Sequence, residues 1–284
     1  MTGGRLLAPA PFLVAGIVNV TPDSFSDGGF FLERQAAMGR VRQVVAEGAG
    51  MVDIGAESTR PGAADIGQDE EWRRLEPVLE ETLLMREGLM NESGGKDIPF
   101  AVAIDTFRSV TARKALESGG VDVINDVSGG AFDPAMDEVL ASYKPGYVLG
   151  HSPARPDVMQ NDPRYDDVVE EILAWFAARM KALVKAGLPE DRIVLDPGFG
   201  FGKNLEHTLA IFGALKRFAS LGRPLYVGIS RKRFIGEITG LETRDRDAPT
   251  QVATAYLAAR GVFAHRVHNV AQAVATLKMV RALP

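Results

Sequence analysis

The sequence contains no cysteine. Disulfide bonds, thiolate nucleophiles and cysteine-based metal sites are therefore excluded, and we expect a reducing compartment, the cytoplasm. The chain also lacks a run of basic residues, and its formal net charge of −5 argues against nucleic acid as a partner. The apolar patch near the N-terminus is too short to span a membrane and is interrupted by Pro9 and Pro11, so we expect neither a targeting segment nor contact with a membrane.

Breaks in composition are lacking as well. No linker rich in proline and serine divides the 284 residues, of which 46% are hydrophobic and 24% are charged. This balance is typical of a globular protein with a large core. Since α/β barrels run to about 250 residues as one unit, we expect a single domain over residues 1–284.

Short apolar, β-branched runs alternate with longer stretches that have the helical spacing of apolar residues. The predicted strands are Phe12–Val18, Gly50–Gly55, Phe100–Ile104, Val121–Asn125, Gly146–Leu149, Arg192–Leu195, Leu225–Ile229 and Val262–Val267. The predicted helices are Glu33–Ala49, Asp69–Met90, Ser109–Ser118, Pro134–Ala141, Tyr165–Ala186, Leu205–Ser220, Ala248–Arg260 and Val270–Arg281. Eight such units predict an α/β fold, a (β/α)8 TIM barrel. A doubly wound sheet is the alternative, but no G-x-G-x-x-G segment follows the first strand.

Every predicted strand ends in a polar side chain. In such barrels the chemistry lies at the strand ends, because the strand fixes a side chain and the loop that follows is free to vary. Helix capping accounts for any single Asp, Asn, Ser or Thr there. It does not account for all eight ends, because lysine and arginine are poor N-caps and buried carboxylates are costly without a partner. The polar ends are Asn19, Glu57–Arg60, Asp105–Thr106, Asn125–Asp126, His151–Ser152, Asp196, Ser230–Lys232, and Arg266 with His268.

Two of these ends, Asp105 and Asp196, follow apolar runs that hold them in a low-dielectric setting, where a carboxylate needs a cation or several N–H donors. A flat heterocycle with adjacent ring N–H and amino groups meets this need with paired hydrogen bonds. Asn125 can contact the neighbouring edge of the same ring, and Lys232 can donate to a ring carbonyl or nitrogen. Asp126 is the rival of Asn125, but strand alternation points it the other way.

The last strand places Arg266 and His268 on one face and His265 on the other, because side chains alternate along a strand. Two donors on one face suit an anion. The alternative, a metal site formed by His265 and His268, conflicts with that alternation and lacks companion ligands. Asn19 ends the first strand, and its amide oxygen suits Mg²⁺, which binds a few protein oxygens together with phosphate and water. Diphosphate, Mg²⁺, Asn19, Arg266 and His268 therefore form a coherent set.

Two long loops, Thr21–Phe31 and Ala56–Gln68, leave the proposed active face. Loops of this length at such a place are usually mobile lids or substrate clamps, and a surface insertion is the alternative. The run Gly198–Lys203 is not a phosphate-binding loop of the G-x-x-x-x-G-K-[ST] type, because asparagine follows its lysine. Its glycines let the backbone approach a flat ligand, and Phe201 either lines an aromatic pocket or packs.

With these residues assembled, the chain resembles the dihydropteroate synthase family from about residue 12 to residue 281. The motifs that carry the resemblance are GIVNVTPDSFSDGG, DIGAESTRPGA, AIDTF, VINDVSGG, LDPGFGFGKN, GISRKRFIG and RVHNV. The resemblance implies a barrel that condenses 6-hydroxymethyl-7,8-dihydropterin diphosphate with 4-aminobenzoate, giving 7,8-dihydropteroate and diphosphate in folate synthesis. It also implies Mg²⁺, a homodimer and a target of sulfonamides.

The resemblance further implies roles for individual residues. The pterin would be held by Asp105, Asn125, Asp196, Phe201 and Lys232. The diphosphate would be held by Asn19, Thr59, Arg266 and His268, with Asn19 also binding the metal. The 4-aminobenzoate would contact Phe25, Thr59, Arg60, Pro61, Phe201, Lys232 and Arg233, with Ser24 beside Phe25. The catalytic residues would be Asp105, Lys232 and Asp27.

Two positions depart from the family pattern. Gly150-His151-Ser152 replaces a Met-His-Met stretch, which leaves the floor of the pterin pocket looser or filled by another side chain. Arg233 stands where the family often has serine, and it either binds the aminobenzoate carboxylate or points to solvent. Two rival functions are a pterin-dependent methyltransferase that acts on a corrinoid protein and a catalytically silent pterin-binding paralogue. The two loops and the Ser-Arg-Lys segment favour the synthase.

Overall fold

The computed structural model describes residues 11–21, 29–94 and 98–284. Within them, eight parallel strands form one sheet in the order β6-β5-β4-β3-β2-β1-β8-β7. A bridge between Leu195 on β6 and Leu225, next to β7, nearly closes this sheet into the predicted barrel. The strands are β1 (Leu13–Asn19), β2 (Met51–Gly55), β3 (Ala101–Asp105), β4 (Val123–Asp126), β5 (Gly146–Gly150), β6 (Ile193–Asp196), β7 (Tyr226–Val227) and β8 (Ala264–Val267).

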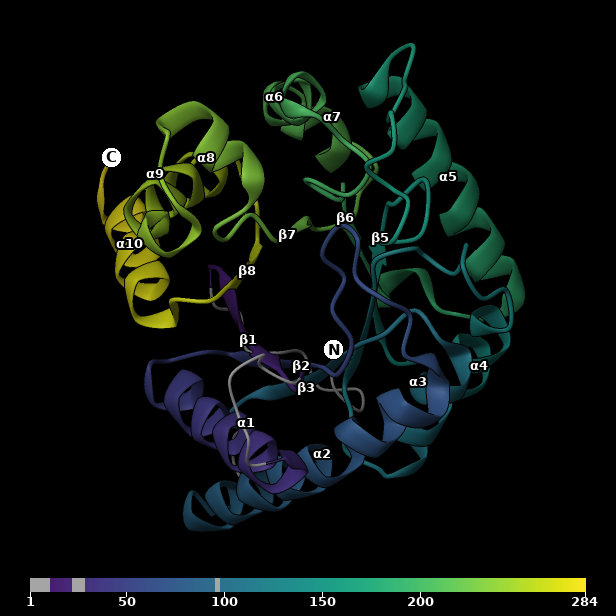
Figure 1. Ribbon diagram of the computed structural model, residues 1–284, viewed down its shortest axis with the longest axis vertical. Coiled ribbons are helices and arrows are strands. Elements are labelled where there is room, and N and C mark those ends of the chain that lie inside the picture. The colour runs from purple at the N-terminus through teal and green to yellow at the C-terminus, as the bar shows by residue number, and fades with distance from the viewer. Residues whose placement is uncertain (1–10, 22–28, 95–97) are drawn as a thin grey trace.

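Helices form a ring outside the strands (Figure 1). They are α1 (Gly29–Ala46), α2 (Gly67–Glu92), α3 (Ser109–Glu117), α4 (Met136–Tyr143), α5 (Val168–Ala186), α6 (Leu205–Gly213), α7 (Leu215–Ala219), α8 (Arg233–Thr239), α9 (Asp247–Ala258) and α10 (Val270–Ala282). Two short 3-10 helices, η1 (Glu190–Arg192) and η2 (Thr243–Asp245), complete the set. Among the described residues, no helix combines the length and the apolar character needed to cross a bilayer.

Most element boundaries lie within a few residues of the predicted ones, and the differences have local causes. The helix predicted over Leu205–Ser220 is two helices, because the backbone at Ala214 leaves the helical region with φ −105° and ψ 9°. The helix predicted from Tyr165 begins at Val168, because the side chain of Asp167 accepts hydrogen bonds from two N–H groups of the first turn. The sequence did not predict α8, since its seven residues contain a glycine and are too few to show a helical period.

Side-chain alternation builds the interior of the barrel in two layers. The lower layer, further from the carboxyl ends of the strands, is a buried apolar cluster of Ala15, Met51, Ala101, Ala103, Val123, Val148, Tyr226 and Ala264. Two residues further along four of these strands, the same face carries Asp53, Asp105, Asn125 and Arg266. A larger apolar cluster packs the outer faces of the strands against the helices. The barrel is therefore filled below, and its polar side chains gather at the carboxyl ends of the strands.

Candidate active site

The polar layer is centred on Arg266. Its Nη2 donates a hydrogen bond to Oδ2 of Asp105 at 2.5 Å, and its Nε donates to Oδ2 of Asp53. Nδ2 of Asn125 donates to the same oxygen of Asp53 at 3.1 Å. Strand register brings these groups together, because Asp105 pairs with Gly55 on β2 and with Asn125 on β4. A Cβ on Gly55 would lie only 3.3 Å from Cβ of Asp105, so glycine leaves room for the carboxylate.

This cluster carries more negative than positive charge, because the two buried carboxylates of Asp53 and Asp105 share one guanidinium. Burial raises the pKa of Asp105 above its usual range; Arg266 opposes this shift and Asp53 adds to it. The second oxygen of Asp53 is buried and has no hydrogen-bond partner among the residues that the structure describes. A ligand that brings N–H donors to the mouth of the barrel supplies what this cluster lacks.

Sequence reasoning did not single out Asp53. It lies inside the apolar strand MVDIG, two residues before the strand ends, and its side chain is fully buried. The signal was present, since an acid in the middle of a buried strand needs a cationic partner. The partner itself is 213 residues away in the sequence, so spacing alone could not identify it.

Asp196, Lys232 and two phenylalanines form the second polar group of the mouth. Oδ1 of Asp196 accepts a hydrogen bond from the N–H of Gly198 at 2.9 Å, and burial raises the pKa of this carboxyl while Lys232 opposes the shift. Nζ of Lys232 donates to the carbonyl oxygen of Phe199 and lies 4.2 Å from the centre of the Phe201 ring. Burial lowers the pKa of Lys232 to about 8. A carboxylate, an amine and an aromatic face thus lie together, a set that suits a flat, polar ring.

The ammonium group of Lys203 stabilises the glycine-rich segment 198–202 through hydrogen bonds. Its Nζ donates to the carbonyl oxygens of Phe201 at 2.9 Å and of His151 at 3.2 Å, and lies 3.0 Å from Nδ1 of His151. Gly198 has a φ of +71°, and a Cβ there would lie 1.9 Å from the carbonyl oxygen of His151. Only glycine fits this close approach of two chain segments. His151 therefore supports the segment that carries Phe201, and its ring packs edge-on against Trp175 at 5.0 Å.

His268 follows β8 and lies beside Ser230, whose Oγ is 3.0 Å from Nδ1 of the imidazole. Arg40 donates to the carbonyl oxygen of His268 and so fixes its backbone. Burial lowers the pKa of His268 to about 3, and Arg266, Arg231 and other arginines add to this shift. The ring is therefore neutral near pH 7, among arginines that favour the approach of an anion.

His265 lies on the opposite face of β8, as alternation predicts, with Nε2 3.2 Å from the carbonyl oxygen of Val262. It cannot join His268 in a metal site. Within residues 11–21, 29–94 and 98–284, no group of three His, Cys, Asp or Glu side chains is arranged to hold a metal ion. Asn19 is exposed at the end of β1, so its amide oxygen fits an ion such as Mg²⁺ that takes its other ligands from phosphate and water.

Two predicted neighbours of the site face away from it. Both carboxylate oxygens of Asp126 are used by its own turn and by Tyr147, whose hydroxyl donates to Oδ2 at 2.9 Å. Asn125, not Asp126, is therefore the residue of β4 that faces the mouth. The side chain of Arg233 is 80% exposed and its Nε donates to Glu237 at 2.7 Å. Of the two orientations expected for Arg233, the structure has the one toward solvent.

The loop residues divide into two groups. Ser24, Phe25 and Asp27 lie outside the described residues. Thr59, Arg60 and Pro61 lie on the loop between β2 and α2, where Arg60 and Pro61 are exposed. The last two line a pocket of about 430 Å³ whose other walls are Thr21, Ser58, Gly62, Ala63, Ala64, Ile66 and Arg74.

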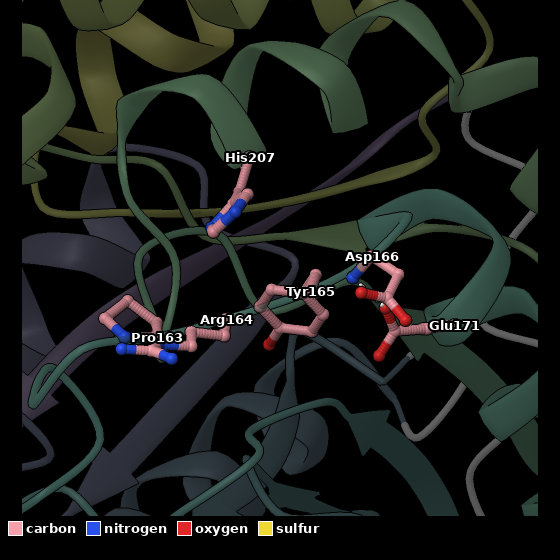
Figure 2. Close-up of a pocket in the computed structure, with 6 residues that line it drawn as sticks. All are labelled: Pro163, Arg164, Tyr165, Asp166, Glu171 and His207. Carbon is pink, nitrogen blue, oxygen red and sulfur yellow. Dashed lines mark hydrogen bonds between the residues drawn. The ribbon is translucent and has the colours of Figure 1, made fainter.

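A separate pocket of about 460 Å³ lies on the rim of the molecule, between the chain that leads into α5 and the start of α6 (Figure 2). Tyr165 and His207 both line it, and their rings pack edge to face with centres 5.0 Å apart. His207 is engaged in the N-terminal cap of α6, where its Nδ1 accepts from the N–H of Asn204 at 3.3 Å. None of the predicted site residues lines this pocket.

Comparisons with known proteins agree with this geometry. Residues 15–268 match the family of pterin binding enzymes. A dihydropteroate synthase of Neisseria meningitidis serogroup B is 41% identical over 95% of this chain and 92% of its own. The structure of Yersinia pestis dihydropteroate synthase with a sulfonamide drug complex has a TM-score of 0.87 at 32% identity, over 99% of this chain and 98% of that one. A Xanthomonas albilineans dihydropteroate synthase with 4-aminobenzoic acid has a TM-score of 0.84 at 38% identity, over 96% and 94% of the two chains. The chain belongs to the family of pterin binding enzymes and, within it, to the dihydropteroate synthases.

Proposed function

We propose that the mouth of this barrel binds a dihydropterin diphosphate and 4-aminobenzoate together and transfers the pterin-methyl group to the amine. The products are 7,8-dihydropteroate and diphosphate. Two solved relatives support these ligands: the Anaplasma phagocytophilum dihydropteroate synthase binds 6-hydroxymethylpterin-monophosphate, and the Xanthomonas albilineans protein binds 7,8-dihydropteroate. The observation that carries the proposal is that two buried carboxyl groups, those of Asp105 and Asp196, lie at the ends of β3 and β6 with Arg266 and Lys232 close enough to oppose the effect of burial on their pKa.

The pterin ring is proposed to lie between the two polar groups of the mouth. Asp105 and Asp196 accept hydrogen bonds from its ring N–H and amino groups, which offsets the cost of burying these carboxylates. Asn125 contacts the next edge of the ring, and Lys232 donates to a ring carbonyl or nitrogen. The ring of Phe201, which already lies against Lys232, stacks on one face of the pterin.

The leaving diphosphate is proposed to meet Arg266, His268, Thr59 and Asn19. Arg266 and His268 extend from the same face of β8, and the arginines around His268 make this side of the mouth the positive one. Bound Mg²⁺, with Asn19 as its protein ligand, would supply neutralisation of the negative charge that develops on the diphosphate.

The reaction is proposed to be a dissociative substitution. The C–O bond breaks and its electron pair leaves with the diphosphate, while the pterin methylene becomes a delocalised cation that Asp105 stabilises. The amine nitrogen then forms the C–N bond and loses a proton to solvent. An aromatic amine is mostly neutral at pH 7, so no strong general base is needed, and the main task of the protein is to position the two rings. Lys232 orients the pterin, and Asp27 is proposed to act with these two residues.

The 4-aminobenzoate is proposed to bind between Phe201 and Lys232 on one side and the loop residues Thr59, Arg60 and Pro61 on the other, with Phe25. Arg233 could reach its carboxylate only if the guanidinium left Glu237 and turned inward from solvent. The test of the whole proposal is release of diphosphate that requires both substrates and Mg²⁺. Calorimetric binding of the pterin without turnover would instead support a silent pterin-binding protein, and methyl transfer to a corrinoid protein would support the methyltransferase.

Further features are part of the proposal. We infer one domain over residues 1–284, in keeping with a family match that covers residues 15–268. We infer a homodimer, as the resemblance to the dihydropteroate synthases implies, and a cytoplasmic location, which suits a chain without cysteine. Inhibition by sulfonamides is supported by the drug complex of the Yersinia pestis relative. Sedimentation of the purified protein and enzyme assays with a sulfonamide test these points.

A further inference from the structure

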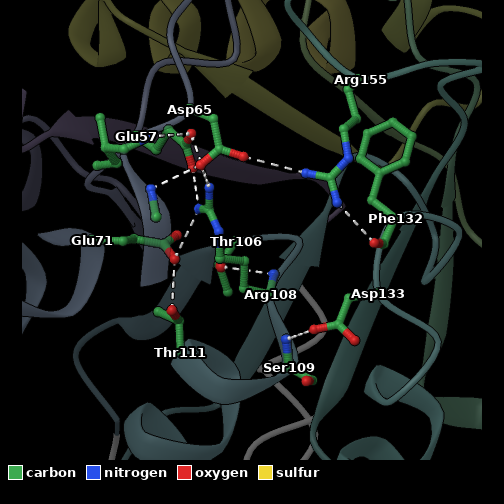
Figure 3. Close-up of polar contacts among 12 residues, drawn as sticks. Glu57, Asp65, Glu71, Thr106, Arg108, Ser109, Thr111, Phe132, Asp133 and Arg155 are labelled. Atoms are coloured by element: carbon green, nitrogen blue, oxygen red, sulfur yellow. Dashed lines mark hydrogen bonds and ion pairs between the residues drawn. The ribbon is translucent and has the colours of Figure 1, made fainter. Parts of the chain in front are cut away.

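One guanidinium, that of Arg108, contacts three carboxylates that come from different places in the chain (Figure 3). Its Nη1 contacts Glu57 and lies 3.2 Å from Oε2 of Glu71. Its Nη2 lies 3.1 Å from Oε1 of Glu57 and 2.6 Å from Oδ1 of Asp65. Glu57 and Asp65 are the two ends of the loop that joins β2 to α2, so Arg108 holds both ends of this loop at once.

The two ends also bind each other directly. Oε1 of Glu57 accepts a hydrogen bond from the N–H of Ile66 at 3.4 Å. Oδ1 of Asp65 accepts one from the N–H of Gly67 at 2.8 Å, just where α2 begins. The loop is thus closed at its base. Its tip rests on the loop after β5, because the N–H of Gly62 donates to the carbonyl oxygen of Pro156 at 3.1 Å.

Two of these three contacts are buried, unlike an ordinary surface ion pair, whereas the side chain of Asp65 is 59% exposed. The side chain of Arg108 is 10% exposed, that of Glu57 is 7% exposed and that of Glu71 is 2% exposed. Glu71 is fixed further by the hydroxyl of Thr111, which donates to Oε2 at 2.6 Å. In such a setting geometry matters, because removing one partner leaves charges without compensation. A planar guanidinium reaches several carboxylates at once, whereas the single ammonium of lysine does not reproduce the fork.

Arg108 itself lies close in the sequence to Asp105, one of the residues proposed to bind the pterin. Arg108 follows Asp105 by three residues in the turn after β3, and its N–H donates to Oγ1 of Thr106 at 3.1 Å. A second arginine, Arg155, supports the outer end of the loop, with Nη1 3.5 Å from Oδ2 of Asp65. The loop is therefore tied to the turn after β3 that carries Thr106 and Arg108 (Figure 3).

We propose that Arg108 is a positioning residue for the second substrate. By closing the base of the loop it presents Thr59, Arg60 and Pro61 to the 4-aminobenzoate, while it contacts no substrate itself. This inference rests on the proposed function, since it takes the loop to contact 4-aminobenzoate. The effect should fall mainly on 4-aminobenzoate, because Thr59 is the one residue of this loop that is also proposed to meet the diphosphate. The pterin ring itself is held by residues of the strands and of segment 198–202.

The test is Arg108→Lys in the full chain, which keeps the charge and removes the fork. We expect KM for 4-aminobenzoate to rise about tenfold, equivalent to ~1.4 kcal/mol. KM for the pterin diphosphate should rise less, staying within about twofold, because Thr59 is the one proposed contact of this substrate that lies on the loop and Asp105 and Asp196 are untouched. Hydrogen exchange of peptides covering residues 57–67 should become faster, because the amides of Gly62 and Ile66 lose their fixed partners.

The matched control is Arg86→Lys. Arg86 lies on α2 and is also buried, but its partners precede β4, at the amino end of the strands. Its Nη1 lies 2.6 Å from Oδ2 of Asp122 and its Nη2 lies 2.6 Å from the carbonyl oxygen of Gly120. We expect this variant to lower the melting temperature and to leave both KM values and exchange of residues 57–67 unchanged. A loss of stability alone therefore cannot mimic the expected result.

Three outcomes would overturn the inference: an unchanged KM for 4-aminobenzoate, an equal rise of both KM values, or unchanged exchange in the loop. If Arg108→Lys yields no soluble protein, Asp65→Ala replaces it, because that side chain is 59% exposed and its loss should not prevent folding. It breaks one end of the tie, and we expect a smaller rise of about threefold in the same KM; no rise would overturn the inference. Failure of the proposed function would appear separately, as wild-type protein that releases no diphosphate in response to 4-aminobenzoate.

Discussion

Replacing Asp105 by asparagine should remove most of the turnover without unfolding the protein. In the proposed mechanism the carboxylate stabilises a cation that exists only near the transition state. Removing a single preorganised electrostatic contact of this kind typically lowers kcat by about 10²–10³-fold, or ~2.7–4 kcal/mol. Binding of the pterin diphosphate should weaken much less, because Asn125, Asp196, Lys232 and the diphosphate contacts remain.

The structure also predicts the effect on stability. Breaking a buried ion pair usually costs about 3–5 kcal/mol, because the remaining charge has no partner. Here Arg266 keeps its contact with Asp53, and the asparagine oxygen can still accept from Nη2. The variant also removes one of two carboxylates that share a single guanidinium. We therefore expect a melting temperature equal to or above that of the wild type.

The pH dependence of this difference has a definite sign. The pKa of Asp105 is raised by folding, so the wild type gains stability from its protonated form at low pH and loses that contribution as pH rises through the folded-state pKa. The asparagine variant does not titrate. Its advantage in melting temperature should therefore be small at acid pH, grow as pH rises and level off above about pH 7.

The assay compares kcat, the dissociation constant of the pterin diphosphate and the melting temperature of wild type, Asp105→Asn and Asp126→Asn. Asp126 is the adjacent buried acid, whose oxygens bind its own turn and Tyr147, so its variant should lose stability and keep kcat. A fall in melting temperature of more than about 6 °C for Asp105→Asn would contradict the charge argument. Equal losses in turnover and in pterin affinity would contradict the cation-stabilising role.

Three more predictions concern other residues of the interior. His268→Ala should weaken binding of the pterin diphosphate by about 10–100-fold and leave the affinity for 4-aminobenzoate unchanged. An unchanged dissociation constant for the pterin diphosphate, measured by calorimetry, would refute this prediction. Folding lowers the pKa of His265 to about 4, so its contribution to stability is present above pH 6.5 and is lost as pH falls. Between pH 7 and pH 5 the wild type should lose about 2 kcal/mol relative to His265→Leu, measured by urea unfolding; parallel curves would exclude this. Lys203→Met leaves the carbonyl oxygens of His151 and Phe201 without their donor, and should lower the free energy of unfolding by about 1–3 kcal/mol. A variant as stable as the wild type would show that the segment does not need this tie.

The fold was readable from the sequence because each strand is a short apolar run and each helix a longer periodic one. Strand ends then followed directly, and Asn19, Asp105 and Asp196 are indeed the last residues of β1, β3 and β6. Boundaries moved where a local backbone feature intervened, as at Ala214 between α6 and α7. That break depends on one residue's dihedral angles, which apolar periodicity does not encode.

The hydrogen-bond and ion-pair partners of the site residues were harder to predict from the sequence. Alternation correctly separated His265 from His268 and Asp126 from Asn125. It could not show that Arg266 binds two acids, because those contacts join strands 161 and 213 residues apart. The role of Arg108 was missed for the same reason, since its three acids become neighbours only when the loop after β2 folds over the turn after β3.

The layered interior of the barrel has a consequence for engineering. On β3, Ala101 and Ala103 belong to the lower apolar layer, while Asp105 ends the same strand in the polar layer of the mouth. Substitutions that improve packing around these alanines are therefore expected to raise the melting temperature and to leave the catalytic residues in place. The polar residues at the carboxyl ends of the strands can be redesigned for another ligand while the apolar layer below them stays unchanged.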